Sequence, residues 1–214
     1  MTNTGRYIRA VLWDMDGTLM DSQPLWDESF RNCCQERGGT VTPEQVAGIA
    51  GASIARTCEL IAETGATASP EDPATAEVFA KISAQVEAAV RAAPPILPGA
   101  RNITATLNEV GLAQVIVTQS PRPIVEAVAH ALGDVFVELV TGDDGLPGKP
   151  TPAPYAAAIE RLGLSPEECV VVEDSATGAA SARSNNLRVI QVGGKTKHFP
   201  GDPGLIVVKD LASI

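Results

Sequence analysis

Short, uninterrupted apolar runs alternate with amphipathic helical patterns along most of this chain, and this alternation constrains the fold more than any other feature. The runs lie at residues 8–13, 114–117, 135–140, 169–172, 187–192 and 205–208. Continuous apolar strands that alternate with helices are typical of a parallel sheet that is covered on both faces. The sequence therefore predicts an α/β fold built on a parallel sheet.

Residues 21–95 interrupt this alternation, because they contain three stretches of helical apolar spacing and no convincing strand. The segment runs into a proline-rich connector at residues 94–99, which stiffens the chain. We therefore predict a core that comprises residues 1–20 and 96–214, with an all-helical cap inserted at 21–95.

The charge of the chain excludes several classes of partner. Acidic residues outnumber basic ones 26 to 16, and the formal net charge is −10. Nucleic acids and anionic membranes both require a basic surface, so we expect neither as a partner. No apolar run approaches the roughly 20 residues of a membrane span, and no signal peptide is recognisable. With four cysteines and no CxxC pair, we expect a cytoplasmic protein with free thiols; the sequence does not indicate an oligomeric state.

Two aspartates follow the first apolar run. Asp14 and Asp16 are two residues apart, so in a strand they point to the same face, with Cα atoms about 6.5 Å apart. An open parallel sheet binds ligands at the carboxyl ends of its strands, and there the pair could flank one reacting group. Gly17 then supplies a tight turn. Taken alone, the tetrapeptide is equally compatible with a polar turn after a strand.

Polar residues also follow the later predicted strands. Thr118 ends the second core strand, and we expect Ser120 to cap a helix whose first residue is Pro121. A helix N-terminus at this edge of the sheet is an anion site. Lys149 precedes a further helix, for which Thr151 is the expected N-cap.

A second acidic pair, Glu173 and Asp174, ends the fourth core strand. Because the carboxyl ends of parallel strands meet at one edge of the sheet, the polar groups of several motifs should converge there. Five such groups are expected at this edge: Asp14, Asp16, Thr118, Lys149 and Asp174. The presence of any one of them has a local explanation, but the convergence of all five does not.

The chain resembles the haloacid dehalogenase-like hydrolase superfamily in four ordered motifs: Asp14-Met15-Asp16-Gly17-Thr18-Leu19, Thr118, Lys149-Pro150 and Glu173-Asp174-Ser175. More narrowly, it is similar to the phosphatase and β-phosphoglucomutase-like branch, whose helical cap is inserted just after the first motif. The resemblance spans roughly residues 8–193. It implies a Rossmann-like core and a mobile cap.

The resemblance also implies roles for these residues. Asp14 would be the nucleophile that forms an aspartyl-phosphate, and Asp16 the general acid and then the general base. Mg²⁺ would be bound by the carboxylates of Asp14 and Asp174 and by the backbone carbonyl of Asp16, with Glu173 beside the metal. The transferring phosphoryl oxygens would be held by Thr118, Gln119 and Lys149.

Differences from similar proteins narrow the predicted reaction. Dehalogenases carry an aromatic residue where this chain has Asp16, and a general acid is needed mainly for a poor alkoxide leaving group. β-Phosphoglucomutases have a histidine and a phosphate-gripping arginine where this chain has Trp26 and Ile54, although Arg56 lies close by. We therefore predict a Mg²⁺-dependent phosphatase that acts on a small, sugar-phosphate-like metabolite. The alternatives are a sugar-phosphate mutase and a catalytically silent protein that binds a phosphorylated ligand.

Overall fold

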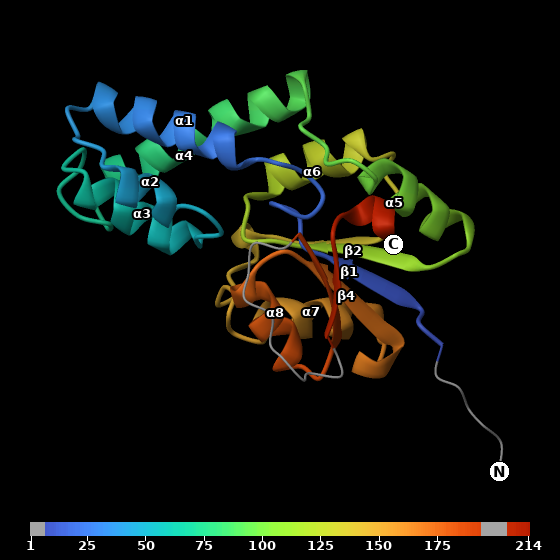
Figure 1. Ribbon diagram of the computed structural model, residues 1–214. Coiled ribbons are helices and arrows are strands. Elements are labelled where there is room, and N and C mark those ends of the chain that lie inside the picture. Colours follow the sequence, from blue (N-terminus) through green and yellow to red (C-terminus); the bar gives the residue numbers. More distant parts are fainter. Residues whose placement is uncertain (1–6, 194–204) are drawn as a thin grey trace, which may run out of the picture.

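The computed structural model describes residues 7–193 and 205–214 of the chain, and its centre is a six-stranded parallel sheet (Figure 1). The strands have the order β3-β2-β1-β4-β5-β6, and every neighbouring pair is parallel. This confirms the predicted α/β core. The strands are β1 (Ala10–Trp13), β2 (Ala113–Val117), β3 (Glu138–Val140), β4 (Cys169–Glu173), β5 (Arg188–Val192) and β6 (Leu205–Val208).

Helices cover both faces of this sheet (Figure 1). Val11 and Trp13 of β1 pack with the cluster that contains α5 (Ala100–Glu109) and α6 (Arg122–Ala131). The alternate residues of β1, beginning with Ala10, pack on the other face with α7 and α8. Because β1 is buried on both sides, its sequence is a continuous apolar run. The helices of the second face are α7 (Ala153–Leu162) and α8 (Ala176–Arg183).

The first four of the helices between β1 and β2 form a unit beyond the carboxyl edge of the sheet (Figure 1). They have a hydrophobic cluster of their own, which includes Phe30, Leu60 and Ile82. As the sequence predicts, no strand occurs among residues 21–95, all of which the structure describes. The helices are α1 (Gln23–Glu36), α2 (Pro43–Gly48), α3 (Ile54–Glu63) and α4 (Pro73–Ala92).

The two connections between the cap and the core run side by side. The Asp21 amide donates a hydrogen bond of 2.9 Å to the Pro95 carbonyl, and the Leu97 amide donates one of 2.9 Å to the Leu19 carbonyl. Both chain crossings therefore meet at one place. We propose that this paired crossing marks the domain boundaries, with the cap at residues 21–95.

Helix α4 belongs to both parts of the molecule. Val78 and Ile82, in its first half, lie in the cap cluster, whereas Val86 and Val90 lie in the main core cluster with residues of α6. The cap is thus joined to the core by apolar packing as well as by its two connections. Within the described ranges, no helix is both long and apolar enough to cross a membrane.

Helices α6 and α7 each begin one residue later than the sequence predicts. The hydroxyl of Ser120, the expected cap of α6, donates instead to Oδ2 of Asp16 at 2.8 Å. The hydroxyl of Thr151, the expected cap of α7, donates to the Pro147 carbonyl at 2.9 Å. Both cap predictions are wrong, because Pro121 and Pro152 occupy the N-cap positions and no side chain caps either helix.

Candidate active site

Two acidic residues end adjacent strands at the centre of the sheet. Asp14 follows β1, and its amide donates a hydrogen bond of 2.9 Å to the Val172 carbonyl of β4. Glu173 is the last residue of β4 and, like Asp14, is buried. The chain pairs β1 with β2 on one side and β4 on the other, so the carboxyl edge here is the point where an open α/β sheet binds its ligand.

Lys149 joins these two carboxylates. Its Nζ lies 2.7 Å from Oδ1 of Asp14 and 2.8 Å from Oε1 of Glu173, and 4% of its side chain is exposed. It also lies 5.0 Å from the centre of the Tyr155 ring. Burial alone would lower the pKa of Lys149, but the carboxylates of Asp14 and Glu173 outweigh burial and raise it well above 10.5. The lysine is therefore a fixed positive charge within the site.

Asp174 adds a third carboxylate to the cluster. Oxygen atoms of Asp14, Glu173 and Asp174 all lie within 4.8 Å of one another. Burial raises the pKa of Asp14 well above its usual 3.8, Glu173 raises it further, and Lys149 opposes both effects. Burial and then Glu173 raise the pKa of Asp174 to about 6. Three carboxylates crowded in this way repel one another, and a bound cation would relieve the repulsion.

The cluster has the ligands that a hard divalent cation requires. Carboxylate oxygens are the preferred ligands of Mg²⁺. Oδ2 of Asp14 is buried and has no hydrogen-bond partner among the described atoms, so this oxygen is left for a ligand. The residues present therefore fit the predicted metal, whose carboxylate ligands would be Asp14 and Asp174.

Gly17 lets the first motif approach this cluster. Its φ is +92°, in the left-handed region that favours glycine, and a Cβ atom there would collide with the carboxylate of Asp174. The backbone turn and the close approach both require glycine at this position. The Asp-x-Asp-Gly pattern thus has a tertiary reason as well as a local one.

Asp16 is held by three hydroxyl groups. Oδ1 accepts from Ser22 at 2.5 Å, and Oδ2 accepts from Thr118 at 2.9 Å and from Ser120 at 2.8 Å. The sequence predicts Thr118 as part of the site, and the structure places it there. It does not predict Ser22 or Ser120, although Ser120 follows Thr118 at the i+2 spacing of an extended chain.

Glu173 has more contacts than its predicted place beside a metal implies. Besides Lys149, it accepts hydrogen bonds from the amide of Ser175 at 2.8 Å and from its hydroxyl at 2.9 Å. The Tyr155 hydroxyl lies 3.4 Å from its Oε1. The helical spacing of Tyr155 predicts an apolar core residue, and nothing in the sequence indicates that its hydroxyl reaches the site.

Gln119 reaches across to the cap. Its Nε2 donates a hydrogen bond of 2.6 Å to the Gly51 carbonyl, in the loop between α2 and α3. The sequence predicts Gln119 as a phosphate ligand. The structure places it in the wall of the same cavity but gives its amide nitrogen a partner in the cap.

These groups open into a cavity of about 320 Å³ between the core and the cap. The core supplies the acidic cluster, Lys149 and Thr118, and the cap supplies Trp26, Ile54 and Phe79. Trp26 also packs against the cap cluster, so it serves both the fold and the cavity wall. A volume near the lower end of the roughly 300–1,000 Å³ range of small-molecule sites suits a small ligand.

Comparisons with known proteins identify the family of this chain. A family model described as haloacid dehalogenase-like hydrolase matches residues 8–186. Hexitol phosphatase B of Escherichia coli strain K12 is 29% identical over 194 residues, which cover 89% of this chain and 86% of that protein. The structure of CbbY from Rhodobacter sphaeroides in complex with phosphate matches with a TM-score of 0.80 at 24% identity, covering 96% of this chain and 95% of that one.

A second solved structure, a β-phosphoglucomutase from Clostridium difficile, has a TM-score of 0.78 at 17% identity and covers 95% of this chain and 92% of its own. Both structures therefore share this fold, cap included. The family match spans all four motifs from Asp14 to Asp174 and confirms the resemblance that they predict. The chain belongs to the haloacid dehalogenase-like hydrolase family.

Proposed function

We propose that this protein is a Mg²⁺-dependent phosphatase, which hydrolyses a phosphate monoester of a small, sugar-phosphate-like metabolite through an aspartyl-phosphate. The observation that carries the proposal is the state of Asp14: it is buried, paired through Oδ1 with Lys149, and has Oδ2 left for a ligand. The name of the similar hexitol phosphatase supports a phosphate monoester as the substrate. No basic surface or membrane segment is needed for such a ligand.

In the first step, a carboxylate oxygen of Asp14 attacks phosphorus and forms an oxygen–phosphorus bond while the ester bond breaks. Asp16 gives its proton to the departing alkoxide, and the alcohol leaves. For this role Asp16 carries a proton in the substrate complex and donates it to the ester oxygen, while its three hydroxyl partners hold the carboxyl group in place.

In the second step, the ionised Asp16 takes a proton from water, and the water oxygen attacks phosphorus. The bond to Asp14 breaks, which releases inorganic phosphate and restores both carboxyl groups. Lys149 and Thr118 line the cavity beside Asp14 and would hold the phosphoryl oxygens, with Gln119 near the cap.

Asp14 and Asp174 would hold Mg²⁺, with the Asp16 carbonyl as a third protein ligand and Glu173 in support. When bound, the ion would offset the charge of the carboxylates and of the phosphate. Lys149 supplies the remaining positive charge. This division explains how a protein of net charge −10 can bind a phosphate dianion. We further propose a cytoplasmic location, in keeping with the four free cysteines.

The decisive experiment measures inorganic phosphate released from a panel of phosphorylated metabolites, with Mg²⁺ and with EDTA. We expect turnover only with Mg²⁺, and none from Asp14→Asn, because the amide keeps the shape of the side chain but cannot attack phosphorus. Asp134→Asn, which changes an exposed aspartate far from the cavity, is the matched control and should behave like the wild type. Substantial turnover by Asp14→Asn would refute the aspartyl-phosphate route.

A coupled assay separates this hydrolase from a sugar-phosphate mutase. The protein is incubated with β-glucose 1-phosphate, Mg²⁺ and a trace of the 1,6-bisphosphate, and glucose 6-phosphate is detected with its dehydrogenase. We expect release of phosphate without isomerisation. Isomerisation that is much faster than phosphate release would make the protein a mutase, and binding without either reaction would make it a silent binding protein.

A further inference from the structure

The charges around the cavity are strongly unbalanced. Among the described residues that line it, Lys149 is the only basic side chain, and it is already paired with both Asp14 and Glu173. Five acidic side chains line the same space: Asp14, Asp16, Asp21, Glu173 and Asp174. A ligand that brings one phosphate has Lys149 and the metal ligands to receive it, but the described residues of the lining offer no basic partner to a second anion.

The cap wall offers apolar surface where a second anion would lie. Trp26, Ile49, Ile54 and Phe79 line this side of the cavity. The hydroxyl of Thr57, the polar side chain of α3 in the wall, donates to the Ser53 carbonyl at 3.1 Å. An anion against these apolar side chains would lose its water and gain no hydrogen bond from them, which is costly.

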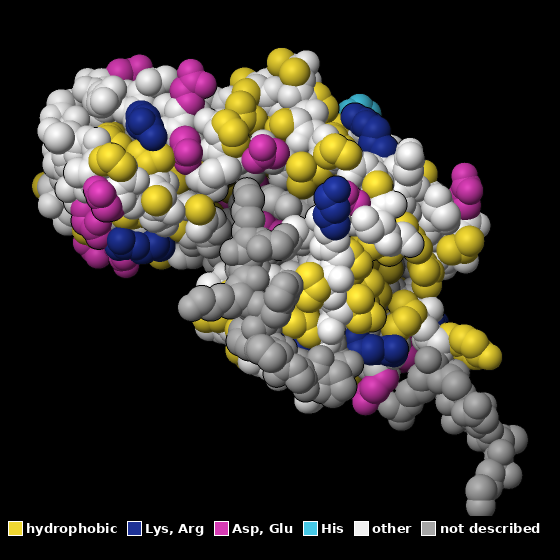
Figure 2. All heavy atoms as spheres, in the orientation of Figure 1, with side chains coloured by type: hydrophobic (Ala, Val, Ile, Leu, Met, Phe, Trp, Pro, Cys, Tyr) yellow, Lys and Arg dark blue, Asp and Glu magenta, His cyan; other side chains and the backbone are white. Residues whose placement is uncertain are grey.

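Basic residues of the cap are held on its outer surface. Arg56 lies 2.7 Å from Glu59 and 2.8 Å from Glu63, and Lys81 pairs with Glu36. Neither Arg56 nor Lys81 lines the cavity. In Figure 2 the Lys and Arg side chains over the cap lie beside acidic ones on the outside of the molecule.

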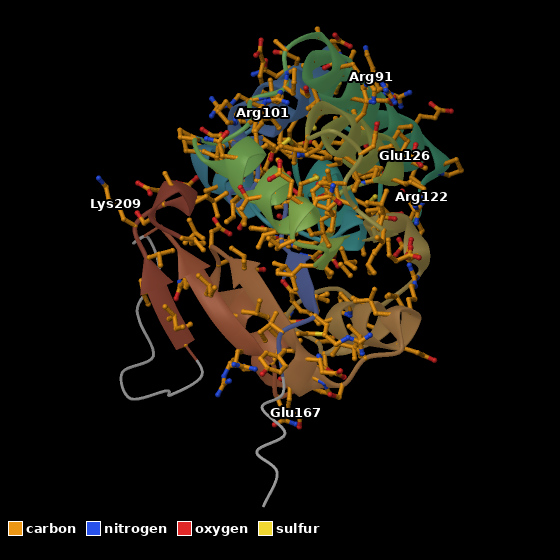
Figure 3. All side chains as sticks on the ribbon, turned by 90° about the vertical axis from the view of Figure 1, so that its right-hand side faces the viewer. Arg91, Arg101, Arg122, Glu126, Glu167 and Lys209 are labelled. Carbon is orange, nitrogen blue, oxygen red and sulfur yellow. The ribbon has the colours of Figure 1, made fainter. Side chains whose placement is uncertain are left out.

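Other basic residues near the junction of the two parts are also engaged elsewhere. Arg91 lies 2.8 Å from Glu87, and Arg122 lies 2.9 Å from Asp144. Both arginines lie at the periphery of the molecule in Figure 3, on the outside of α4 and α6. Recruiting one of them to the cavity would break an existing ion pair.

We propose that this cavity takes phosphate monoesters of uncharged alcohols that have an apolar face, and that it discriminates against substrates whose leaving group carries a second phosphate or a carboxylate. The proposal rests on the phosphatase function proposed above and specifies its substrate class. Trp26, Ile54 and Phe79 are the residues that determine it. They contact the leaving group rather than the transferring phosphate.

The test compares two matched pairs of substrates by phosphate release in the presence of Mg²⁺. The pairs are glucose 6-phosphate with glucose 1,6-bisphosphate, and ethyl phosphate with phosphoglycolate. A free-energy difference of ~1.4 kcal/mol corresponds to a tenfold change in kcat/KM. An unpaired anion beside like charges costs more than this. We therefore expect kcat/KM to be about tenfold or more higher for the substrate of each pair whose leaving group is uncharged. Equal values within both pairs would overturn the proposal.

A gain-of-function variant tests the cap wall without removing a core residue. Ile54→Arg adds a cation at a partly exposed position of this wall, and Ile54→Gln is the uncharged control of similar length. We expect Ile54→Arg to reduce the preference against glucose 1,6-bisphosphate by about tenfold, and Ile54→Gln, which adds a hydrogen-bond donor without a charge, to reduce it by less. The same effect from both variants, or no effect from either, would contradict the role of charge.

Acetyl phosphate separates failure of this proposal from failure of the phosphatase function. Its leaving group is small, so its turnover reports the phosphoryl-transfer groups and not the cap wall. Turnover of acetyl phosphate together with equal use of monophosphates and bisphosphates would leave the phosphatase in place and overturn the substrate class. No phosphate release from acetyl phosphate or any other substrate would overturn both.

Discussion

Asp174→Asn should stabilise the metal-free protein. Burial and Glu173 raise the pKa of Asp174 to about 6 in the folded state, against a usual value of 3.8. The folded protein therefore binds a proton more tightly at this carboxyl group than the unfolded chain does. As pH rises from about 4 through 6, the unfolded chain loses its proton first, and stability falls. Above pH 6 the folded protein carries an unfavourable charge at this position.

The magnitude follows from the difference between the two pKa values. About two pH units at ~1.36 kcal/mol per unit give roughly 3 kcal/mol as the most that this charge costs at pH 8. The asparagine variant lacks the charge, so in EDTA at pH 8 it should be more stable than the wild type by up to that amount. At pH 4, where Asp174 is largely protonated when folded, the difference should fall below about 1 kcal/mol.

Urea unfolding in EDTA at pH 4 and pH 8 measures this difference. With a slope of about 3 kcal/mol per molar urea, typical of a chain of this size, the midpoint at pH 8 should rise by up to about 1 M. Glu109→Gln, which removes one exposed negative charge, is the control for net charge and should not shift the midpoint. Saturating Mg²⁺ should reverse the order, because about 1,000 times Kd of ligand stabilises the wild type alone by ~4.1 kcal/mol.

Equal stability of the wild type and Asp174→Asn at pH 8 in EDTA would refute the repulsion that we describe. A difference that is the same at pH 4 and pH 8 would refute its electrostatic origin. In either case the three carboxylates would not be the strained cluster that a cation relieves.

Three further variants test separate features. Lys149→Met leaves the buried carboxylates of Asp14 and Glu173 without a counter-ion and should cost about 3–5 kcal/mol at pH 8. In urea unfolding the loss should shrink at low pH, because burial and then Glu173 raise the pKa of Asp14 and favour its protonation; a loss independent of pH would contradict this. Gly17→Ala forces an alanine to φ +92° and into the Asp174 carboxylate, so calorimetry should show weaker Mg²⁺ binding and a lower Tm; unchanged Mg²⁺ affinity would show that the turn is not limiting. Gln119→Leu removes the hydrogen bond to Gly51, and amide hydrogen exchange in residues 49–52 should become faster, whereas equal exchange would mean that the loop is held by other contacts.

The sheet and most helices could be predicted because burial leaves a clear periodic signal. Helix α8 leaves none, since its buried face consists of small residues such as Gly178, Ala179 and Ala182. A Cβ atom on Gly178 would collide with the Glu173 carboxylate. The small residues of α8 therefore leave room for the Glu173 carboxylate, and for the same reason the helix shows no apolar pattern in the sequence. Helix α2 is hidden for a different reason, because Val46 is its one buried residue.

The candidate site divides in the same way. Asp14, Asp174 and Lys149 could be placed from the sequence because each lies at the end of a predicted strand or in the loop beyond it, and topology alone brings such positions together. Ser22 and Ser120 could not, since each hydroxyl reaches Asp16 through an orientation that several elements set jointly. Tertiary contacts of this kind have no sequence period.

The sharing of α4 between two hydrophobic clusters limits how caps can be exchanged between relatives. A chimaera that receives residues 21–95 also receives Val86 and Val90, which must fit the apolar face of α6 in the recipient. A transplant of the cap alone would place side chains of α4 against an α6 face that they do not fit. Deletion of the cap would leave that face of α6 exposed to water. Successful grafts should therefore carry α6 with the cap, even though α6 belongs to the other part of the chain.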